Sequence, residues 1–337
     1  MGRFLIVDGS SMLVTSYYGL LPKQILFAKT EEEKEAYYDK IMQYKGQYTN
    51  AMYTMTKTLR KLEKEQQITH MVICFDTTRD TFRREEYPLY KANRGSTPVP
   101  LKQQFINMEN MLREIGYAVE TSDSYEADDL AGSAAFMYES RMPTYIITKD
   151  HDYLQLISEN TFLWLIQTKQ EAADDITKRY ASAFCDQTKF NLPDKAALIT
   201  PEICRAEYGV DPSMIPDLKG IVGDSSDNIP GVKGVSSAAA PLLKEYGSID
   251  GVYEAIDSCK NDKEIKALSS FWKEALGIKR TPVNALIRDR DMAFLSRRLA
   301  TIKRDVPLSH SFEQMSLDRL SEGKRVEQYK KYGFKTI

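Results

Sequence analysis

FLIVD (residues 4–8), VICFD (residues 72–76) and YIITKD (residues 145–150) are three short apolar runs that each end on an aspartate. Each run has the length and the β-branched or aromatic content of a buried strand. In an open α/β sheet, ligands bind just outside the carboxyl ends of the strands. We therefore expect Asp8, Asp76 and Asp150 to converge, and because like charges repel, the cluster needs a cation. The pattern predicts a metal site.

The rest of residues 1–166 alternates between strand-like and helix-like segments. Helical spacing of apolar residues predicts helices near 46–66 and 101–115, and a helix from about Glu126 to Arg141. Strands separated by helices indicate βαβ units, so the predicted fold is α/β with a mainly parallel sheet flanked by helices.

Two further regions follow this sheet-forming part. Residues 167–199 are polar and lack periodicity, which we interpret as an insertion or connection. Residues 200–337 have a helical pattern, with Pro201 suited to a helix start. Within them, residues 219–247 are dense in Gly, Asp and Ser.

Composition excludes some classes of protein. The chain has 337 residues and a formal net charge of −2, unlike a strongly basic nucleic-acid binder. Its four cysteines form no CxxC pair, which argues against a zinc ribbon and for a reducing compartment. No stretch approaches the roughly 18 apolar residues of a membrane span. We expect a cytoplasmic protein without a membrane partner.

More acids accompany the strand-end aspartates. Glu126, Asp128 and Asp129 fall in the first turn of a predicted helix, where acids also simply complement the helix dipole. Three acids within four residues go beyond that need. Asp152 repeats the acid at Asp150, and a last group reads GDSSDN over residues 223–228, which alone would pass as a turn.

Together these nine carboxylates favour oxygen-loving divalent cations. The set is Asp8, Asp76, Glu126, Asp128, Asp129, Asp150, Asp152, Asp224 and Asp227. All-oxygen ligation suits Mg²⁺ or Mn²⁺ and not zinc. So many carboxylates predict two ions, the arrangement used for phosphodiester displacement.

Basic residues lie next to these acids in the sequence. The segment 77–104 contains Arg79, Arg83, Arg84, Lys91 and Arg94, interleaved with aromatic residues that include Tyr90. A run of charges is often only a solvated face. Beside a metal cluster, however, cations would serve an approaching phosphate and aromatics would stack on bases.

Residues 229–235, IPGVKGV, resemble a helix-hairpin-helix turn. Glycines in such a turn let backbone N–H groups approach phosphates. On its own this motif is weak evidence, but here it directly follows the acidic GDSSDN segment.

Five stretches together resemble the flap endonuclease / 5′–3′ exonuclease family, most closely its bacterial and phage branch, which includes the amino-terminal exonuclease domain of bacterial DNA polymerase I. They are LIVDGS (5–10), the FR and YKANR elements within 75–94, YEADD (125–129), TKDHDYLQL (148–156) and GDSSDNIPGVKG (223–234). They occur in family order. The resemblance implies a PIN-like fold with a helical arch over 77–104 and a helix-hairpin-helix region at 219–247.

The resemblance also implies a role for each matched residue. A first metal ion would be held by Asp8, Asp76, Glu126 and Asp128, and a second by Asp150, Asp152 and Asp227, with Asp129 and Asp224 close by as ligands or through water. Arg83, Lys91 and Arg94 would act at the base of the arch, with Tyr90 stacking or packing there. The hairpin Gly231, Val232, Lys233 and Gly234 would grip the DNA duplex, with a K⁺ ion at its carbonyls.

The chain departs from the family pattern after Gly234. The run VSSAAAP over residues 235–241 lacks a glycine and a lysine that would contact phosphate. This departure predicts a weaker or rearranged duplex grip and calls the K⁺ ion into question. Residues 20–48 are also longer and more charged than the family pattern, without an assignable role.

Three functional hypotheses follow. The first is a divalent-metal-dependent, structure-specific 5′ nuclease, acting as a monomer on DNA with 5′ flaps, gaps or ends in replication or repair. The second is a catalytically idle DNA-junction binder, supported by the altered hairpin but opposed by the intact acids, whose repulsion would destabilise a fold that did not need them. The third is an RNA-cutting PIN-like enzyme, opposed by the arch and hairpin segments.

Overall fold

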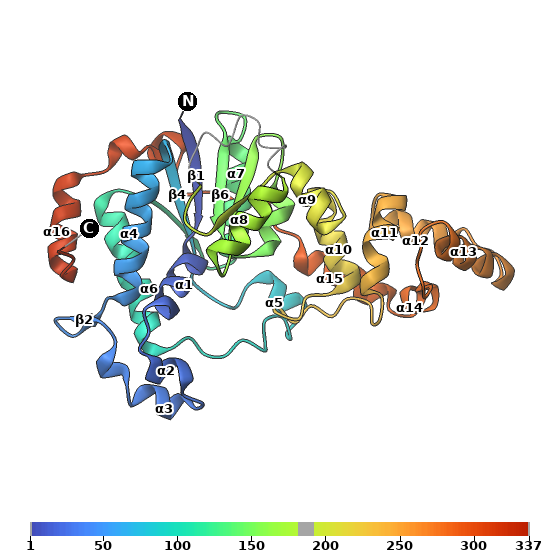
Figure 1. The fold of residues 1–337 in the computed structure, drawn as a ribbon, viewed down its shortest axis with the longest axis horizontal. Coiled ribbons are helices and arrows are strands. Elements are labelled where there is room, and N and C mark those ends of the chain that lie inside the picture. Colours follow the sequence, from blue (N-terminus) through green and yellow to red (C-terminus); the bar gives the residue numbers. More distant parts are fainter. Residues whose placement is uncertain (1, 181–191, 336–337) are drawn as a thin grey trace.

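A six-stranded sheet lies at the centre of the computed structural model, which describes residues 2–180 and 192–335 (Figure 1). Its strands run in the order β5-β4-β1-β6-β7-β8. They are β1 (Arg3–Asp8), β4 (Ile68–Asp76), β5 (Ala118–Ser122), β6 (Thr144–Thr148), β7 (Thr161–Ile166) and β8 (Ala196–Ile199). Every neighbouring pair is parallel except β7 and β8. The predicted α/β fold with a mainly parallel sheet is confirmed.

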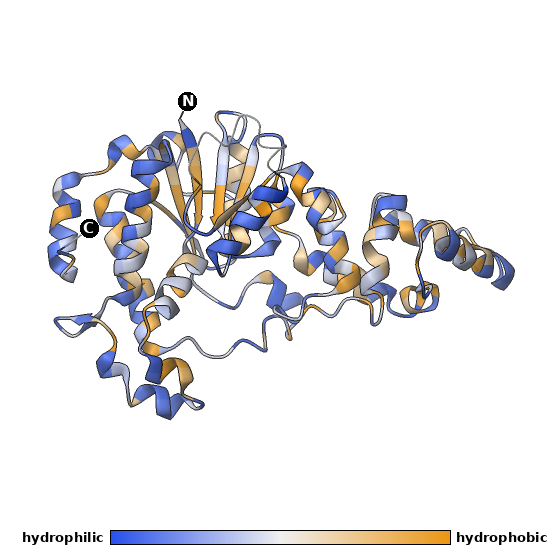
Figure 2. Cartoon of the chain, viewed as in Figure 1, coloured by the Kyte–Doolittle hydropathy of each residue, from blue (hydrophilic) through white to orange (hydrophobic). Residues whose placement is uncertain are grey.

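The first apolar run forms the middle of this sheet. All six residues of β1 are buried, because β4 pairs with one edge of the strand and β6 with the other while helices cover its faces. A strand buried on both faces is hydrophobic at consecutive positions and not at alternate ones. Figure 2 shows this apolar character along the central strands.

Helices surround the sheet. α1 (Gly9–Gly19), α4 (Asn50–Glu65) and α6 (Val99–Ile115) pack against one another, and α7 (Ala127–Tyr138) packs on β1, β4 and β5. α4 buries Ala51, Met55, Leu59 and Leu62 at the helical spacing seen in the sequence. The 3₁₀ helix η2 (His151–Leu156) follows β6 directly.

Residues 20–48 project away from the sheet at the lower left of Figure 1. They form α2 (Lys23–Phe27), α3 (Glu31–Glu35), the 3₁₀ helix η1 (Tyr38–Lys40) and a two-stranded hairpin of β2 (Gln43–Tyr44) and β3 (Gln47–Tyr48). α3 buries no residue, in keeping with its run of glutamates.

The segment 167–199 contains regular structure that its sequence did not indicate. α8 (Gln170–Arg179) follows β7, and β8 then pairs antiparallel with β7 and extends the sheet. All four residues of β8 are buried. The part of this segment that the structure describes therefore belongs to the sheet architecture; residues 181–191, with Cys185, lie outside the described residues.

The chain after residue 200 is helical, as expected, and reaches away from the sheet before returning to it. Its elements are α9 (Pro201–Tyr208), η4 (Pro212–Met214), α10 (Ile215–Val222), α11 (Ser236–Tyr246), α12 (Ile249–Asp257), α13 (Asp262–Glu274), α14 (Val283–Arg288), α15 (Arg290–Ala300), η5 (Phe312–Met315), η6 (Leu317–Arg319) and α16 (Glu322–Tyr332). α11 to α14 form the extension at the right of Figure 1, and α16 packs on α6 at the opposite end.

The returning segment is fixed to the sheet by Glu120 of β5. This buried carboxylate accepts hydrogen bonds from the backbone N–H groups of Ser309 and His310 at 3.0 and 2.9 Å. Within the described residues, no helix is long and apolar enough to cross a membrane.

Candidate metal and phosphate site

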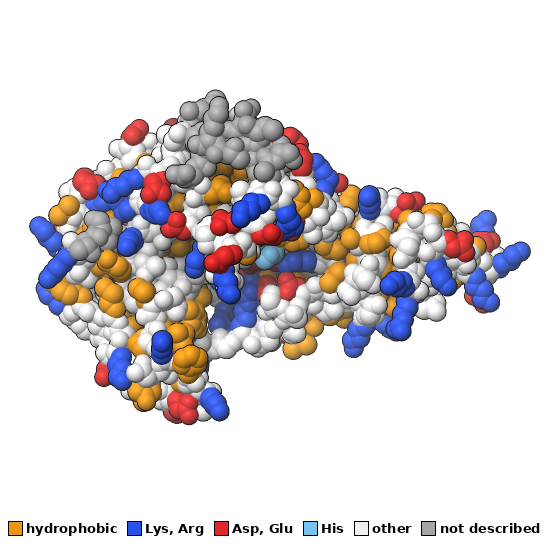
Figure 3. Space-filling model, viewed as in Figure 1, with side chains coloured by type: hydrophobic (Ala, Val, Ile, Leu, Met, Phe, Trp, Pro, Cys, Tyr) orange, Lys and Arg blue, Asp and Glu red, His pale blue; other side chains and the backbone are white. Residues whose placement is uncertain are grey.

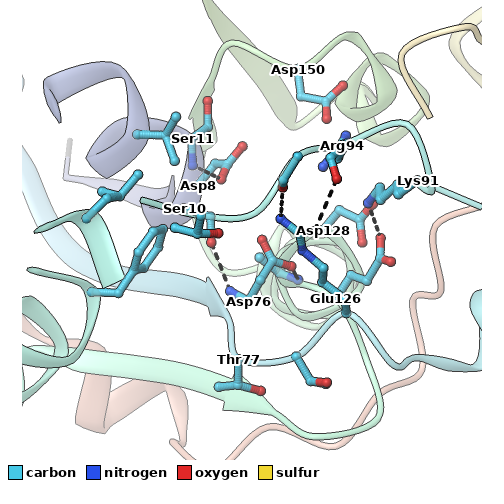
Figure 4. A pocket seen from close by; sticks show the side chains of 18 of the residues that line it. Asp8, Ser10, Ser11, Asp76, Thr77, Lys91, Arg94, Glu126, Asp128 and Asp150 are labelled. Atoms are coloured by element: carbon cyan, nitrogen blue, oxygen red, sulfur yellow. Dashed lines mark hydrogen bonds and ion pairs between the residues drawn. The ribbon is translucent and has the colours of Figure 1, made fainter. Parts of the chain in front are cut away.

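The three strand-end aspartates line one pocket of about 1530 Å³ at the carboxyl edge of the sheet. Asp8 caps α1 by accepting the Ser11 N–H at 2.9 Å, and its other oxygen accepts the Thr148 hydroxyl at 2.5 Å. Asp76 accepts the N–H of Ala127 at 2.8 Å. Asp150 accepts the N–H of Asp152 at 2.9 Å. Figure 4 shows these carboxylates around a common space, as the sequence predicted.

The start of α7 adds Glu126 and Asp128 to the same pocket. Glu126 is the N-cap residue, and its side chain and that of Asp129 form a capping box. The buried Oδ1 atom of Asp128 accepts no hydrogen bond from the described residues, and Nη1 of Arg83 is 3.9 Å away. An unpartnered buried carboxylate oxygen at a pocket is suited to bind a cation.

Asp129 does not point into this pocket. Both of its oxygens accept hydrogen bonds from the Arg83 guanidinium at 2.7 Å, and Oδ1 also accepts the N–H of Lys303 at 2.8 Å. The side chain is fully buried. The expectation that Asp129 lies among the metal ligands is therefore not supported, because its lone pairs are committed to structural partners.

Arg83 is likewise a structural residue and does not line the pocket. Its guanidinium is 1% exposed and donates to the carbonyl oxygens of Leu299 and Thr301 at 2.9 and 2.8 Å, in addition to Asp129. A guanidinium with these partners cannot reach a phosphate without leaving them. These contacts give Arg83 a structural role, and its predicted catalytic role stays a prediction. Its neighbour Arg84 does line the pocket.

Lys91 and Arg94, from the arch segment over residues 77–104, line the pocket. Nζ of Lys91 lies 2.6 Å from Glu126 and 3.6 Å from Asp227, and Arg94 forms an ion pair with Asp227. Tyr90 is 3% exposed and its hydroxyl donates to Glu126 at 3.1 Å, so its ring packs in this wall and is not free to stack on a base. α5 (Phe82–Glu86) precedes these residues.

Asp152 and Asp224 pair with a lysine that the sequence reasoning missed. Lys219 of α10 forms ion pairs with Asp152 and, at 2.7 Å, with Asp224. Both Lys219 and Asp224 line the pocket, while Asp227 is buried beside Lys91 and Arg94. The sequence did contain a signal for Lys219, because it lies on a short helix just before the acidic loop.

The described cations compensate only part of this acidic set. Arg83, Lys91, Arg94 and Lys219 pair with its members, but Asp8, Asp76 and Asp150 have no ion-pair partner among the described residues. Figure 3 shows acidic and basic side chains together in this hollow. The three strand-end aspartates therefore remain available for an external cation, as does the Oδ1 atom of Asp128.

The pKa values follow the same division. Burial raises the pKa of Asp8 to about 7 and raises that of Asp150 as well as that of Asp128. Burial acts in the same direction on Glu126, but the charges of Lys91 and Arg83 outweigh it and lower the pKa of that carboxyl. The pKa is thus raised at Asp8 and Asp150, which have no ion-pair partner among the described residues, and lowered at Glu126, which pairs with Lys91.

The donor chemistry fits divalent metal ions, although the ligands are not assembled around one point. The acidic side chains that line the pocket offer carboxylate oxygens, and Asp128 keeps a buried oxygen that accepts no hydrogen bond from the described residues. Yet no group of three or more described Asp, Glu, His or Cys side chains is arranged to hold a metal ion as it stands. Lys91, Arg94 and Lys219 occupy several of the carboxylates instead.

The predicted hairpin lies between α10 and α11. Gly231 has φ of +61° and is buried against Gly223, such that an added Cβ atom would lie 2.3 Å from the Gly223 nitrogen. Val232 is buried, whereas Lys233 and Gly234 are exposed at the turn, where a backbone could approach a phosphate. Gly234 has φ of +82°, and a Cβ atom there would meet open space.

This difference between the two glycines predicts unequal effects of alanine. We expect Gly231→Ala to destabilise the protein by about 3 kcal/mol or more, because strain at positive φ adds to a backbone clash. Gly234→Ala, the matched control, should lower the free energy of unfolding by only about 1 kcal/mol, because the positive φ is its only source of strain. Urea denaturation of both variants measures this. Equal midpoints would contradict the close packing of Gly231.

Comparison with known proteins places this architecture in a family. Residues 3–183 match the N-terminal resolvase-like domain of 5′–3′ exonucleases, and residues 210–322 match their C-terminal SAM fold. The chain belongs to the 5′–3′ exonuclease family. The resemblance inferred from the five sequence motifs is therefore confirmed.

Relatives of this 5′–3′ exonuclease family member include DNA polymerases about three times as long as well as a 5′–3′ exonuclease of similar length. The chain is 31% identical to DNA polymerase I of Bacillus caldotenax over 99% of its own length but only 32% of that protein. It thus spans about a third of the length of the DNA polymerases it matches. It is also 28% identical to a 5′–3′ exonuclease of Mycoplasma pneumoniae, covering 100% of this chain and 98% of that protein.

Solved structures share the fold of this exonuclease family member. A T5 5′-exonuclease with bound zinc has a TM-score of 0.57 at 17% identity, covering 88% of this chain and 89% of the other. The catalytic core of Rad2 in complex with DNA has a TM-score of 0.51 at 14% identity, covering 98% of this chain and 88% of the other. At these identities the likeness concerns the fold alone.

Proposed function

We propose that this chain is a divalent-metal-dependent 5′ nuclease that hydrolyses phosphodiester bonds of DNA. The observation that carries the proposal is the pocket in which Asp8, Asp76 and Asp150 lack a paired cation among the described residues, while Lys91 and Arg94 reach into the same space. Acids that bind cations and bases that bind phosphate are both needed for this reaction.

The metal ions proposed are Mg²⁺ or Mn²⁺. One group of ligands is Asp8, Asp76, Glu126 and Asp128, and the other is Asp150, Asp152 and Asp227, with Asp224 nearby. When bound, two such ions supply positive charge that activates a water and offsets charge on the leaving oxygen. A T5 5′-exonuclease has been solved with divalent zinc and a related T5 flap endonuclease with DNA and metal ions, which supports a divalent cation here.

The chain's own residues would prepare the ligands and place the substrate. Ser11, Thr148 and the start of α7 hold Asp8 and Asp76 by hydrogen bonds, so these carboxylates are oriented before a cation arrives. Lys91 and Arg94 would exchange carboxylate partners for a phosphate when cations bind the acids. Arg84 lines the pocket and would add a further contact to the strand.

The substrate class proposed is DNA with 5′ flaps, gaps or ends, bound by a monomer. The turn at Lys233 and Gly234 would contact the backbone of a duplex, while the pocket beneath the arch segment accepts the strand to be cut. A K⁺ ion at the hairpin would assist this contact. The Rad2 core was solved with a DNA substrate, which supports DNA as the ligand of this fold.

Two alternatives lead to different expectations. An idle junction binder would keep the hairpin and have no use for the repulsive acids. An RNA-cutting enzyme would cut single-stranded RNA in preference to flap DNA. Burial of Asp8 and Asp150 without an ion-pair partner among the described residues is costly, and a cost of that kind is typical of a functional site.

Replacing Asp76 by alanine distinguishes a nuclease from an idle binder. Asp76 is exposed in the pocket, so the change should leave the fold intact. We expect cleavage of a 5′-flap DNA to fall by on the order of 10³-fold, with the dissociation constant for the same DNA in Ca²⁺ nearly unchanged. Wild-type protein that binds the flap and cuts nothing in Mg²⁺ or Mn²⁺ would favour the idle binder.

A further inference from the structure

The base of the arch segment is tied to the acidic loop by hydrogen bonds that the proposed chemistry does not use. We call these three bonds the latch: Asn228 Nδ2 donates to the Leu89 carbonyl at 2.7 Å, Asn93 Nδ2 donates to the Ser225 carbonyl at 2.8 Å, and the Lys91 N–H donates to the Asp227 carbonyl at 2.9 Å. Each bond joins segments more than a hundred residues apart in the sequence.

Two residues of the latch have a left-handed backbone. Asn228 has φ of +57° and Lys91 has φ of +53°. Asparagine adopts this region readily, but a lysine there is unfavourable by about 1 kcal/mol or more. Such strain persists only where surrounding contacts impose it. The latch contains those contacts, because the strained Lys91 itself donates to Asp227.

An apolar cluster lies beneath the latch. Tyr90 and Ile229 are buried together with Leu299 and Ala300 at the end of α15. This cluster is separate from the main core of the protein. The arch base, the acidic loop and α15 therefore pack as one unit, and the two arch residues Lys91 and Arg94 depend on this unit for their position.

The hairpin belongs to the same unit. Gly231 follows Asn228 by three residues, and its N–H donates to the Ser296 hydroxyl of α15 at 2.9 Å. A bound duplex that shifts the hairpin would therefore also shift Asn228, and through its hydrogen bond to Leu89 the base of the arch. Asn228 reaches Leu89 through a side-chain donor, and glycine can keep its left-handed backbone, so Asn228 is the residue to test.

We propose that Asn228 is a positioning residue: by holding Leu89 it places Lys91 and Arg94 at the carboxylates and couples duplex binding at the hairpin to cleavage. The inference rests on the proposed nuclease function and adds to it a residue that touches neither metal nor substrate. It predicts that loss of the Asn228 amide lowers turnover without weakening duplex binding.

The decisive variant is Asn228→Gly, because glycine keeps the left-handed backbone and removes the side chain with its amide donor. We expect kcat on a 5′-flap DNA to fall by roughly 10- to 100-fold, since a displacement of about 1 Å can have this effect. The Kd for the same DNA in Ca²⁺ should stay within about twofold of wild type. Hydrogen–deuterium exchange of residues 89–94 should become faster in the DNA-free protein.

A second variant, Asn93→Ala, removes the reciprocal bond at an exposed position where folding is not at risk. As in Asn228→Gly, kcat should fall and hydrogen–deuterium exchange of residues 89–94 should become faster. Asn284→Ala, at an exposed asparagine of α14, is the matched control and should change neither. The inference would be overturned if Asn228→Gly and Asn93→Ala both had the kcat and the exchange rates of the wild type. It would also be overturned if their affinity for DNA fell by the same factor as their turnover.

The same experiment separates the two proposals. A wild-type protein that cuts no substrate defeats the proposed nuclease function, whereas the exchange measurement still tests the latch. If wild type cuts the flap and Asn228→Gly cuts it equally well, the nuclease function stands and the positioning role fails.

Discussion

Replacing Asp8 by asparagine is expected to slow cleavage strongly and at the same time to stabilise the metal-free protein. Asp8 is 5% exposed, lacks an ion-pair partner among the described residues, and has a pKa raised by burial to about 7. The asparagine side chain would keep an oxygen for the Ser11 N–H, so the cap of α1 survives. Loss of a metal ligand should lower kcat by on the order of 10³-fold.

The gain in stability depends on pH in a defined direction. Because the folded-state pKa of Asp8 lies above the unfolded value near 4, the wild type loses stability as pH rises from about 4 to 7. A pKa difference of 1 between the folded and unfolded states corresponds to about 1.4 kcal/mol, so Asp8→Asn should stabilise by roughly 2–4 kcal/mol at about pH 8. Near pH 4 the difference in stability between the Asp8→Asn variant and the wild type should vanish. Thermal unfolding in EDTA at both pH values measures it.

A surface aspartate provides the control for this experiment. Asp39→Asn changes the same chemical group at an exposed position of η1 and should alter neither turnover nor stability. Saturating Mg²⁺ should stabilise wild type by mass action and narrow its gap to the Asp8→Asn variant. A variant that is less stable than wild type in EDTA at pH 8 would contradict the unpaired-carboxylate account.

The second large effect concerns stability alone. Arg83→Met should destabilise the protein by about 3–5 kcal/mol, because it leaves the fully buried Asp129 without its bidentate partner. It also removes the donors to the Leu299 and Thr301 carbonyls, which join the arch segment to the end of α15. Urea denaturation, read as the free energy of unfolding, tests this directly.

Its neighbour provides a matched comparison. Arg84 is partly exposed and pairs only with the exposed Asp80 among the described residues, at 3.3 Å. Arg84→Met should therefore change stability by about 0.5 kcal/mol or less but weaken DNA binding in low salt. If Arg83→Met unfolded at the wild-type midpoint, or if Arg84→Met were the more destabilised of the two, the structural assignment of Arg83 would be wrong.

The sheet and the acidic centre could be located from the sequence because both depend on local patterns. β1, β4 and β6 each contain a run of apolar residues, and in β1 and β4 an aspartate follows that run directly, which placed Asp8 and Asp76. By contrast, β8 consists of four small or aliphatic residues after a polar stretch, and only its pairing with β7 makes it a strand.

Partners in the folded chain could not be predicted in the same way. Asp128 and Asp129 are adjacent in one acidic motif. Yet Arg83 donates to both oxygens of Asp129, whereas Asp128 lines the pocket. Likewise, the sequence left open whether Tyr90 stacks or packs at the arch base, and in the folded chain its ring packs against Ile229. Which of several similar side chains meets a buried partner is decided by tertiary packing, which spacing does not encode.

The most direct test of the central claim is a cleavage panel with mapped products. Purified protein is incubated with end-labelled 5′-flap, nicked, gapped and blunt DNA duplexes and with single-stranded RNA, in Mg²⁺, Mn²⁺ or EDTA. We predict cuts near the junction or at the 5′ end of the DNA substrates in either metal and none in EDTA. Intact flap DNA in both metals, with protein that is folded and binds the flap, would contradict the account.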